Sequence, residues 1–328
     1  MNKFKPIPLL IIFFAIVFSS CNSKDTIPLI FDTDANNEID DQHALAYLLF
    51  NQNSFDIKGI TVNSTTNGGN INKQYDEAKR VMQLCGYYKK IPLLKGANGS
   101  FRDNENDLKN PDFDGHSAVN FIIDEALKYS PKKKLTLLAV GKLTNVALAV
   151  KKEPFILPNI RLVWLGSNYP ESGEYNLEND IDSINFLLQT DIEFEIVTVR
   201  YGKLSGTDFV KVTREEVDAK MTRLGRKINS PVIGRHGGEF FTFGEYSKSL
   251  FDNTPFYGDP PTRSLFDMAA VAILKNPSWA QPSFISAPLI LNNKWVNQQG
   301  KSRKVKIWEN FNRDLILKDF YEVLTDGK

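Results

Sequence analysis

Short apolar runs alternate with longer amphipathic segments along most of this chain. Several of these runs, such as 135–140, are almost continuously apolar, which is typical of strands covered on both faces. The strands predicted from them are 27–31, 55–62, 135–140, 160–165 and 194–199. The helices predicted from apolar residues at helical spacing are 41–50, 72–85, 116–129 and 144–150. This alternation predicts a single α/β domain with a mostly parallel, Rossmann-like open sheet flanked by helices.

The second half of the chain is less regular. Segment 223–258 contains many glycines and aromatic residues, and we expect it to form a cap or an active-site lid. A strand at 304–308 and a final helix at 315–324 are predicted near the C-terminus. There is no internal repeat and no linker rich in proline, glycine or serine, so one domain is the simplest interpretation.

The N-terminus has a different composition from the rest. Two lysines precede an apolar run of about a dozen residues, which is too short to span a bilayer, and two serines and Cys21 follow. This order resembles the signal of bacterial lipoproteins, in which that cysteine carries the lipid. We therefore expect residues 1–20 to be a lipoprotein signal peptide, 21–27 a polar tether and 28–328 the folded domain. The protein would then be exported and held at the periplasmic or outer surface of a bacterial membrane by the lipid anchor only; a plain cleaved signal is the alternative.

Composition and charge exclude several classes of protein. The 328 residues include 40 Lys and Arg against 39 Asp and Glu, a formal net charge of +1, so nothing indicates a nucleic-acid partner. Two cysteines cannot provide a disulfide framework. The sequence leaves a homo-oligomer open.

Oxygen-bearing side chains follow four of the predicted strands. Because ligands bind at the carboxyl ends of parallel strands, these side chains are candidate site residues. They are Asp32, Asp34, Asp40 and Asp41 after the first strand, Asn63 and Asn67 after the second, Thr144 after the third, and Ser167, Asn168, Glu174 and Asn176 after the fourth.

The loop after the first strand is strongly acidic. Positions 32–41 hold five acids and no lysine or arginine. Two carboxylates about 4 Å apart repel each other by about 4 kcal/mol at an effective dielectric constant near 20. A hard divalent cation would relieve this repulsion, and calcium tolerates a loose loop better than magnesium does.

Several motifs compete for this loop. An EF-hand loop starting at Asp32 would need glycine and glutamate where Asn37 and His43 stand, so that match fails. A phosphotransferase of the haloacid dehalogenase type matches only in part, because Asn36 occupies the fifth position of its motif. An acidic helix N-terminus would account for Asp40 and Asp41 but not for the acids before them.

A fourth interpretation is a resemblance. An acid pair after the first strand, a short loop and a second acid pair resemble the N-terminal signature of nucleoside hydrolases, although the loop is two residues longer here. Further segments that resemble this family follow in order: 60–67, 141–147 (Gly-Lys-Leu-Thr-Asn-Val-Ala), Asn168 with Glu174, Asn176 and Asp180, and 266–271 (Phe-Asp-Met-Ala-Ala-Val).

The resemblance implies a role for each matching residue. Asp34, Asp41, Asp267 and the backbone carbonyl of Thr144 would bind Ca²⁺, and Asp34 would also take the proton of the attacking water. Asp40 would contact a ribose hydroxyl, and Asp32 would orient the loop. The other hydroxyls would be held by Asn168, Glu174 and Asn176, with Asn67 nearby.

One position departs from the family pattern. Phe266 stands where the inosine- and uridine-preferring branch has a histidine, and phenylalanine cannot protonate a leaving base. His116 and His236 are candidate substitutes, whereas His43 is expected to be structural or exposed. Tyr246 and Tyr257 would stack on a base or belong to the core.

Three functions therefore remain open. The first is calcium-dependent hydrolysis of ribonucleosides, with a small-molecule nucleoside as substrate. The second is hydrolysis of another ribosyl compound on the same scaffold. The third is a surface lipoprotein that binds nucleosides or sugars without turnover.

Overall fold

An eight-stranded sheet forms the centre of the computed structural model, which describes residues 26–298, 300 and 302–326. Its strand order is β11-β14-β6-β5-β4-β1-β2-β3, and every neighbouring pair is parallel except β11 with β14. The strands are β1 (Ile27–Thr33), β2 (Phe55–Val62), β3 (Leu93–Lys95), β4 (Leu135–Ala139), β5 (Ile160–Ser167), β6 (Glu193–Thr198), β11 (Gln281–Ser286) and β14 (Lys304–Glu309).

The strand order locates the crevice where a ligand binds. The order β3-β2-β1-β4-β5-β6 reverses direction between β1 and β4, and crevices in open parallel sheets lie at such switch points. The prediction of a mostly parallel, Rossmann-like open sheet in a single α/β domain is confirmed.

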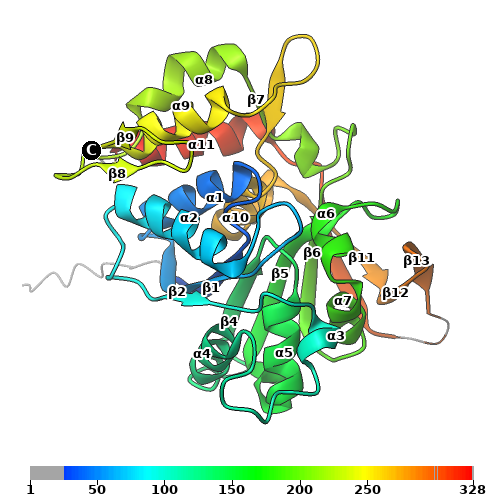
Figure 1. Ribbon diagram of the computed structural model, residues 1–328. Helices are drawn as coiled ribbons and strands as arrows, with labels where there is room; N and C mark the ends of the chain where they lie inside the picture. Colours follow the sequence, from blue (N-terminus) through cyan, green and yellow to red (C-terminus); the bar gives the residue numbers. More distant parts are fainter. Residues whose placement is uncertain (1–25, 299, 301, 327–328) are drawn as a thin grey trace, which may run out of the picture.

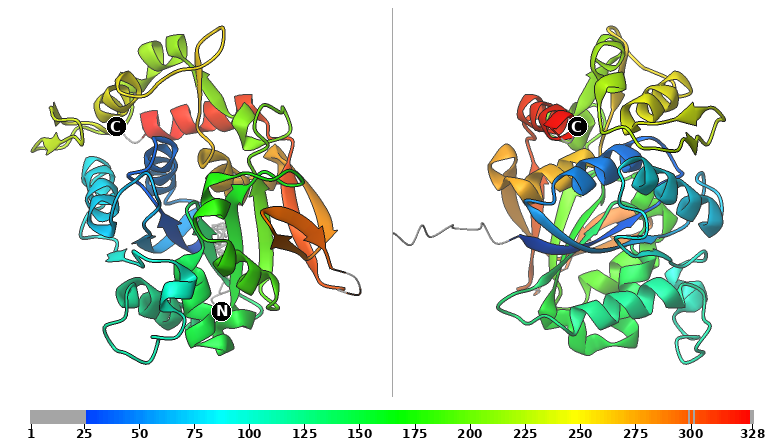
Figure 2. Two further views of the ribbon diagram at one scale, coloured as in Figure 1. Left: turned by 45° about the vertical axis from the view of Figure 1, so that its right-hand side comes forward. Right: turned by 90° about the vertical axis from the view of Figure 1, so that its left-hand side faces the viewer.

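Helices cover both faces of the sheet (Figures 1 and 2). Side chains alternate along β1, so that Leu29 and Phe31 join one buried core and Ile30 joins the other. Helices α1 (Asp40–Phe50), α2 (Ile71–Leu84), α10 (Met268–Lys275) and α11 (Arg313–Asp326) pack on the first face. On the second face lie α3 (Phe101–Asn104), α4 (His116–Ala126), α5 (Thr144–Lys152) and α7 (Ile181–Leu188).

Smaller elements surround this sandwich. A short helix, α6 (Tyr175–Asn179), follows β5, and α8 (Arg214–Lys220) and α9 (Phe243–Asp252) lie with α11 at the top of Figure 1. Separate two-stranded sheets are formed by β7 (Lys211–Thr213) with β10 (Thr262–Ser264), β8 (Val232–Ile233) with β9 (Glu239–Phe240), and β12 (Pro288–Leu291) with β13 (Lys294–Asn297). The 3₁₀ helices are η1 (Pro154–Asn159), η2 (Thr207–Phe209), η3 (Met221–Arg223) and η4 (Pro277–Trp279).

Segment 223–258 is more regular than the sequence suggests. It contains the β8–β9 hairpin and α9, and Thr242 and Glu245 start that helix with a reciprocal capping box. Within this segment, Tyr257 and Gly258 are the residues that line the main pocket described below. Most of the segment therefore packs beside the domain core and does not form a lid.

Helix α10 was not predicted from the sequence. Its residues from Met268 to Leu274 are all buried, so the segment has no polar face and no helical periodicity to detect. Conversely, the predicted strand 55–62 matches β2 residue for residue.

The predicted signal peptide, Cys21 and most of the tether lie outside the described residues. Ile27, the last residue of the predicted tether, is already the first residue of β1. Within 26–298, 300 and 302–326, no helix is both long and apolar enough to cross a membrane.

Candidate active site

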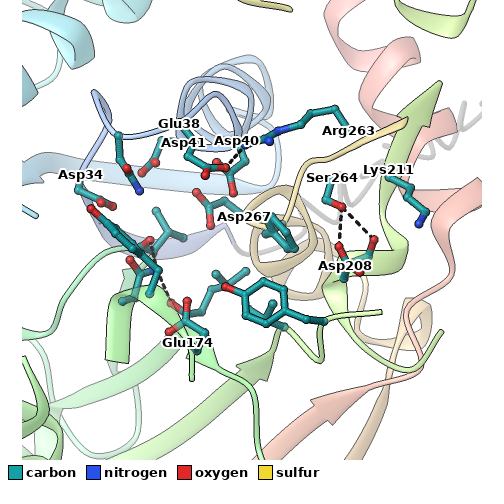
Figure 3. A pocket seen from close by; sticks show the side chains of 18 of the residues that line it. Asp34, Glu38, Asp40, Asp41, Glu174, Asp208, Lys211, Arg263, Ser264 and Asp267 are labelled. Atoms are coloured by element: carbon teal, nitrogen blue, oxygen red, sulfur yellow. Dashed lines mark hydrogen bonds and ion pairs between the residues drawn. The ribbon is translucent and has the colours of Figure 1, made fainter. Parts of the chain in front are cut away.

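A pocket of about 580 Å³ opens where β1, β4, β5 and β6 end, and we call it the carboxylate pocket (Figure 3). The acids Asp40, Asp41 and Asp267 lie close together, and Asp208 and Lys211 lie at the opposite side of the pocket from Asp34. Its lining consists of Asp34, Asn37, Glu38, Asp40, Asp41, Val140, Leu165, Glu174, Tyr175, Asn176, Val199, Tyr201, Asp208, Lys211, Tyr257, Gly258, Thr262, Arg263, Ser264, Phe266 and Asp267.

Two helix N-termini bring three buried carboxylates together. Asp40 and Asp41 form the first turn of α1, and Asp267 immediately precedes α10. Oxygen atoms of these three side chains lie within 4.8 Å of one another. The partial positive charge of a helix N-terminus favours acids there, but it does not neutralise three of them. Such a set of buried carboxylate oxygens fits a hard divalent cation.

Asp34 faces the same pocket from the end of β1. One of its carboxylate oxygens accepts a hydrogen bond of 2.6 Å from the Thr65 hydroxyl. The other approaches the backbone of Gly141, where an added Cβ atom would lie only 2.8 Å from it. A glycine at position 141 is therefore required to leave room for the Asp34 carboxylate.

Asp32 lies behind the pocket and anchors the acidic loop. Its carboxylate accepts hydrogen bonds of 2.5 Å from Thr61, 2.9 Å from Asn63 and 2.7 Å from Asn145. Burial raises the pKa of Asp32 to about 6, and these three donors oppose that rise. These hydrogen bonds fix the end of β1 to β2, to the residue after it and to α5, just ahead of Asp34 in the chain.

Burial raises the pKa of five acids of the pocket, Asp34, Asp40, Asp41, Glu174 and Asp267. It raises the pKa of Asp34 and of Asp40 to about 7, and that of Glu174 to about 8. The pKa values of Asp41 and Asp267 lie well above the ordinary range, first because of burial and then because of the neighbouring carboxylates. This mutual repulsion is the physical reason why a cation would bind here.

Glu174 and Asn176, two of the predicted sugar-binding residues, line the pocket. One carboxylate oxygen of Glu174 accepts a 2.8 Å hydrogen bond from the Leu177 backbone amide. The side-chain amide of Asn176 donates to the carbonyl oxygens of Val140 at 2.8 Å and Leu165 at 3.2 Å. Because its donors are engaged, the Asn176 side-chain oxygen is the atom left to accept a hydroxyl group.

The pocket lining does not include three of the predicted site residues, Asn67, Asn168 and Thr144. The Asn67 backbone amide donates to the Tyr175 hydroxyl at 2.7 Å, and the Asn168 side chain closes its own loop by donating to the Ser172 carbonyl oxygen. The Thr144 hydroxyl donates to Asp180, as part of the start of α5.

Thr144 itself does not line the pocket. Val140 lines the pocket at this end of β4 instead, directly after the last strand residue. Three residues separate it from Thr144, and the chain turns into α5 within them. The roles predicted for Thr144, Asn67 and Asn168 stay predictions.

Neither candidate histidine reaches the pocket. His116, the first residue of α4, forms a hydrogen bond with the Phe113 carbonyl oxygen. His236 is an exposed residue between β8 and β9. His43 is fully buried between the Ile39 carbonyl oxygen and Ser247, as expected for a structural residue.

The two tyrosines proposed for the base have different environments. Tyr246 is buried and donates a 2.5 Å hydrogen bond to Glu77, so it belongs to the core. Tyr257 is 62% exposed and lines the pocket. Of the two, only Tyr257 is positioned to contact a ligand.

Several pocket residues were missed by sequence analysis. Tyr201 packs edge-on against Phe266, with ring centroids 5.9 Å apart and an interplanar angle of 82°. It follows the end of β6, so extending the strand-end criterion to that strand would have found it. Asp208, Lys211 and Arg263 lie on or beside short elements that leave no hydrophobic pattern in the sequence.

Residues 29–317 match the family model described as inosine-uridine preferring nucleoside hydrolase. The chain belongs to this family. The family match also replaces the EF-hand and phosphotransferase hypotheses for the acidic loop.

Individual nucleoside hydrolases are similar over parts of the chain. It is 27% identical over 169 residues to a putative pyrimidine-specific ribonucleoside hydrolase RihB of Shigella boydii, a match that covers 49% of this chain and 61% of the relative. It is 27% identical over 188 residues to the non-specific ribonucleoside hydrolase RihC of Salmonella paratyphi A, covering 51% and 60%. These matches span less than two thirds of the relatives.

Solved nucleoside hydrolase structures share the fold over a greater length. A plant nucleoside hydrolase, PpNRh1, has a TM-score of 0.68 at 19% identity, covering 92% of this chain and 99% of that one. The purine-preferring ribonucleoside hydrolase of Gardnerella vaginalis has a TM-score of 0.66 at 17% identity, covering 92% and 98%.

Proposed function

We propose that this protein hydrolyses the N-glycosidic bond of ribonucleosides, releasing ribose and the free base, with calcium as its cofactor. The observation that carries the proposal is the cluster of Asp40, Asp41 and Asp267, which lies beside Asp34 in the carboxylate pocket of a nucleoside hydrolase family member.

The acids of the pocket suit a reaction in which the sugar becomes positively charged. Breaking the bond between C1′ and the base nitrogen gives ribose oxocarbenium character, and surrounding carboxylates stabilise that charge. Asp34 would accept the proton of the attacking water, since its carboxylate lines the pocket at the end of β1. Asp40, Glu174 and the side-chain oxygen of Asn176 would hold the ribose hydroxyls.

Asp40, Asp41 and Asp267 would bind the cation, and Asp34 would add a fourth carboxylate beside them. A bound calcium ion would lower the pKa of a water molecule and offset the repulsion among these carboxylates. Exclusion of bulk water by Phe266, Tyr201 and Leu165 would strengthen each of these charge interactions.

Phe266 supports a second candidate, hydrolysis of another ribosyl compound on the same scaffold. No histidine is found in the pocket lining formed by the described residues, so a base that needs protonation would lack an imidazole donor. A binding lipoprotein without turnover is the third candidate, which the intact Asp34 disfavours.

Base release from a panel of purine and pyrimidine ribonucleosides tests the proposal. Protein lacking residues 1–21 would be assayed with calcium and then with a chelator. We expect calcium-dependent release that Asp34→Asn lowers by about 10²–10⁴-fold, the range typical of a lost general base. The matched control is Asp56→Asn, which removes a carboxylate that is 46% exposed on β2 and should retain activity. Calcium binding measured by calorimetry without release of any base would favour the binding protein.

We also propose that the protein is an exported lipoprotein anchored through Cys21. The support is the order of basic residues, apolar run, small residues and cysteine in the first 21 positions. Metabolic labelling with palmitate should mark the wild-type chain and not Cys21→Ser. Equal labelling of both chains would contradict the anchor.

A further inference from the structure

Two basic side chains, Lys211 and Arg263, are among the residues that line the carboxylate pocket. They come from the antiparallel strands β7 and β10, where Ser264 is the direct partner of Lys211. Arg263 reaches Glu38 beside the acidic cluster, whereas Lys211 lies at the other side of the pocket from Asp34 and Asp41 (Figure 3). Because β10 precedes Phe266, which stands where the family has a proton donor for the leaving base, we expect the leaving group near this strand.

Arg263 has an unsatisfied donor although it is almost completely buried. Its side chain is 10% exposed, and one guanidinium nitrogen pairs with Glu38, which is 44% exposed. Its Nε atom is buried without a hydrogen-bond partner. The guanidinium also lies 6.0 Å from the ring centroid of Tyr257. A buried donor without an acceptor is unfavourable, and an acceptor atom of a ligand would satisfy it.

Lys211 likewise has no acceptor. Its ammonium group forms no hydrogen bond or ion pair with any residue in the described part of the chain. Asp208, the acid at this side, is already engaged: one oxygen accepts the Ser264 hydroxyl at 2.7 Å and the other accepts the Gly202 amide at 2.7 Å. Lys211 is therefore a charged donor in the pocket lining that no described side chain pairs with.

We propose that Lys211 and Arg263 recognise a leaving group that carries negative charge. This inference rests on the proposed N-ribosidase function. In the reaction the water oxygen bonds to C1′, the bond from C1′ to the ring nitrogen breaks, and one water proton passes to Asp34. The bonding electron pair departs with the ring nitrogen, and Phe266 supplies no proton to it. Positive charge at Lys211 and Arg263 stabilises an acidic base during this step.

Negative charge on the base has two chemical sources, a ring carboxylate and an acidic lactam, and two matched substrate pairs distinguish them. Nicotinic acid riboside has a carboxylate where nicotinamide riboside has an amide. Xanthosine has one more oxo group than inosine, and this group makes its base acidic. For the wild type we expect kcat/KM to favour the charged member of at least one pair by about tenfold, the size of one charge-assisted hydrogen bond.

Lys211→Met should remove most of that preference. The ratio of kcat/KM within the pair should fall towards one, because the charged substrate loses more than the neutral one. The control Lys318→Met removes a lysine that is 68% exposed on α11 and should keep the wild-type ratio. A general loss of folding would lower both members equally, so the ratio separates recognition from stability. Binding of nicotinate against nicotinamide, measured by calorimetry, gives the same contrast without turnover.

The outcomes separate the two proposals. If the wild type cleaves these ribosides in a manner that depends on Asp34 but prefers the neutral members, or if Lys211→Met keeps the wild-type ratio, the charge-recognition proposal is wrong and the N-ribosidase proposal stands. If none of the four compounds nor any nucleoside of the panel is cleaved, both proposals are wrong.

Discussion

Acidification should stabilise this protein when no metal is bound. Burial raises the pKa of Asp34 and of Asp40 from the ordinary 3.8 to about 7. At pH 5.5 these carboxyl groups therefore hold protons in the folded protein but not in the unfolded chain. Raising the pH to 8 removes protons from the folded state only, so the free energy of unfolding falls.

The magnitude follows from the size of the shift. Between pH 5.5 and a folded pKa of about 7, each group loses about 1.4 kcal/mol of stabilisation per pH unit. Asp34 and Asp40 would thus each contribute about 2 kcal/mol to the difference between pH 5.5 and pH 8. Glu174, whose pKa is raised to about 8, acts in the same direction.

Urea unfolding of chelator-treated protein at the two pH values measures this difference. Asp34→Asn removes one titrating group, and it should reduce the pH difference by about 2 kcal/mol. Calcium should stabilise the protein more at pH 8 than at pH 5.5, because it competes with protons for the same oxygens. A metal-free protein that is more stable at pH 8 than at pH 5.5 would refute the reasoning about the carboxylate cluster.

Three further substitutions test individual contacts. Gly141→Ala places a methyl group 2.8 Å from the Asp34 carboxylate, so we expect kcat to fall at least about tenfold when base release is measured. Arg235→Met removes the donors to two carbonyl oxygens of the acidic loop, and calorimetry should show calcium affinity weakened by about tenfold. Ser247→Ala leaves the buried Nε2 atom of His43 without a partner, and urea unfolding should show a loss of about 1–3 kcal/mol.

Each of these variants has a control or an opposite outcome. Wild-type kcat in Gly141→Ala would mean that the Asp34 carboxylate can shift without loss. Arg223→Met removes an exposed arginine and should keep wild-type calcium affinity. Unchanged stability of Ser247→Ala would indicate that water satisfies His43.

The sequence predicted the sheet well because its strands are covered on both faces. Runs such as Leu29–Phe31 are apolar for a physical reason, because β1 lies between two cores: Leu29 and Phe31 belong to one and Ile30 to the other. The same criterion failed for α10, where burial on all sides removed the periodicity that marks a helix. A fully buried strand can therefore be recognised by its apolar run, whereas a fully buried helix lacks the polar face by which a helix is recognised.

Site residues were predictable where they follow long strands. Asp34, Glu174 and Asn176 reach the pocket because β1 and β5 end at the crevice. Lys211 and Arg263 could not be predicted, since strands of three residues leave no detectable pattern and their position depends on pairing between distant segments. The position of these two residues in the pocket is set by the pairing of β7 with β10 and not by their local sequence.

The β7–β10 ladder shares no backbone hydrogen bonds with the eight-stranded sheet. Replacing Lys211 or Arg263 would therefore disturb neither the register of the large sheet nor the anchoring of Asp32. Arg263 is an exception in one respect, because its ion pair with Glu38 connects the ladder to the acidic loop. For engineering, Lys211 is therefore the position at which to begin a library, since it lies at the other side of the pocket from Asp34 and Asp41.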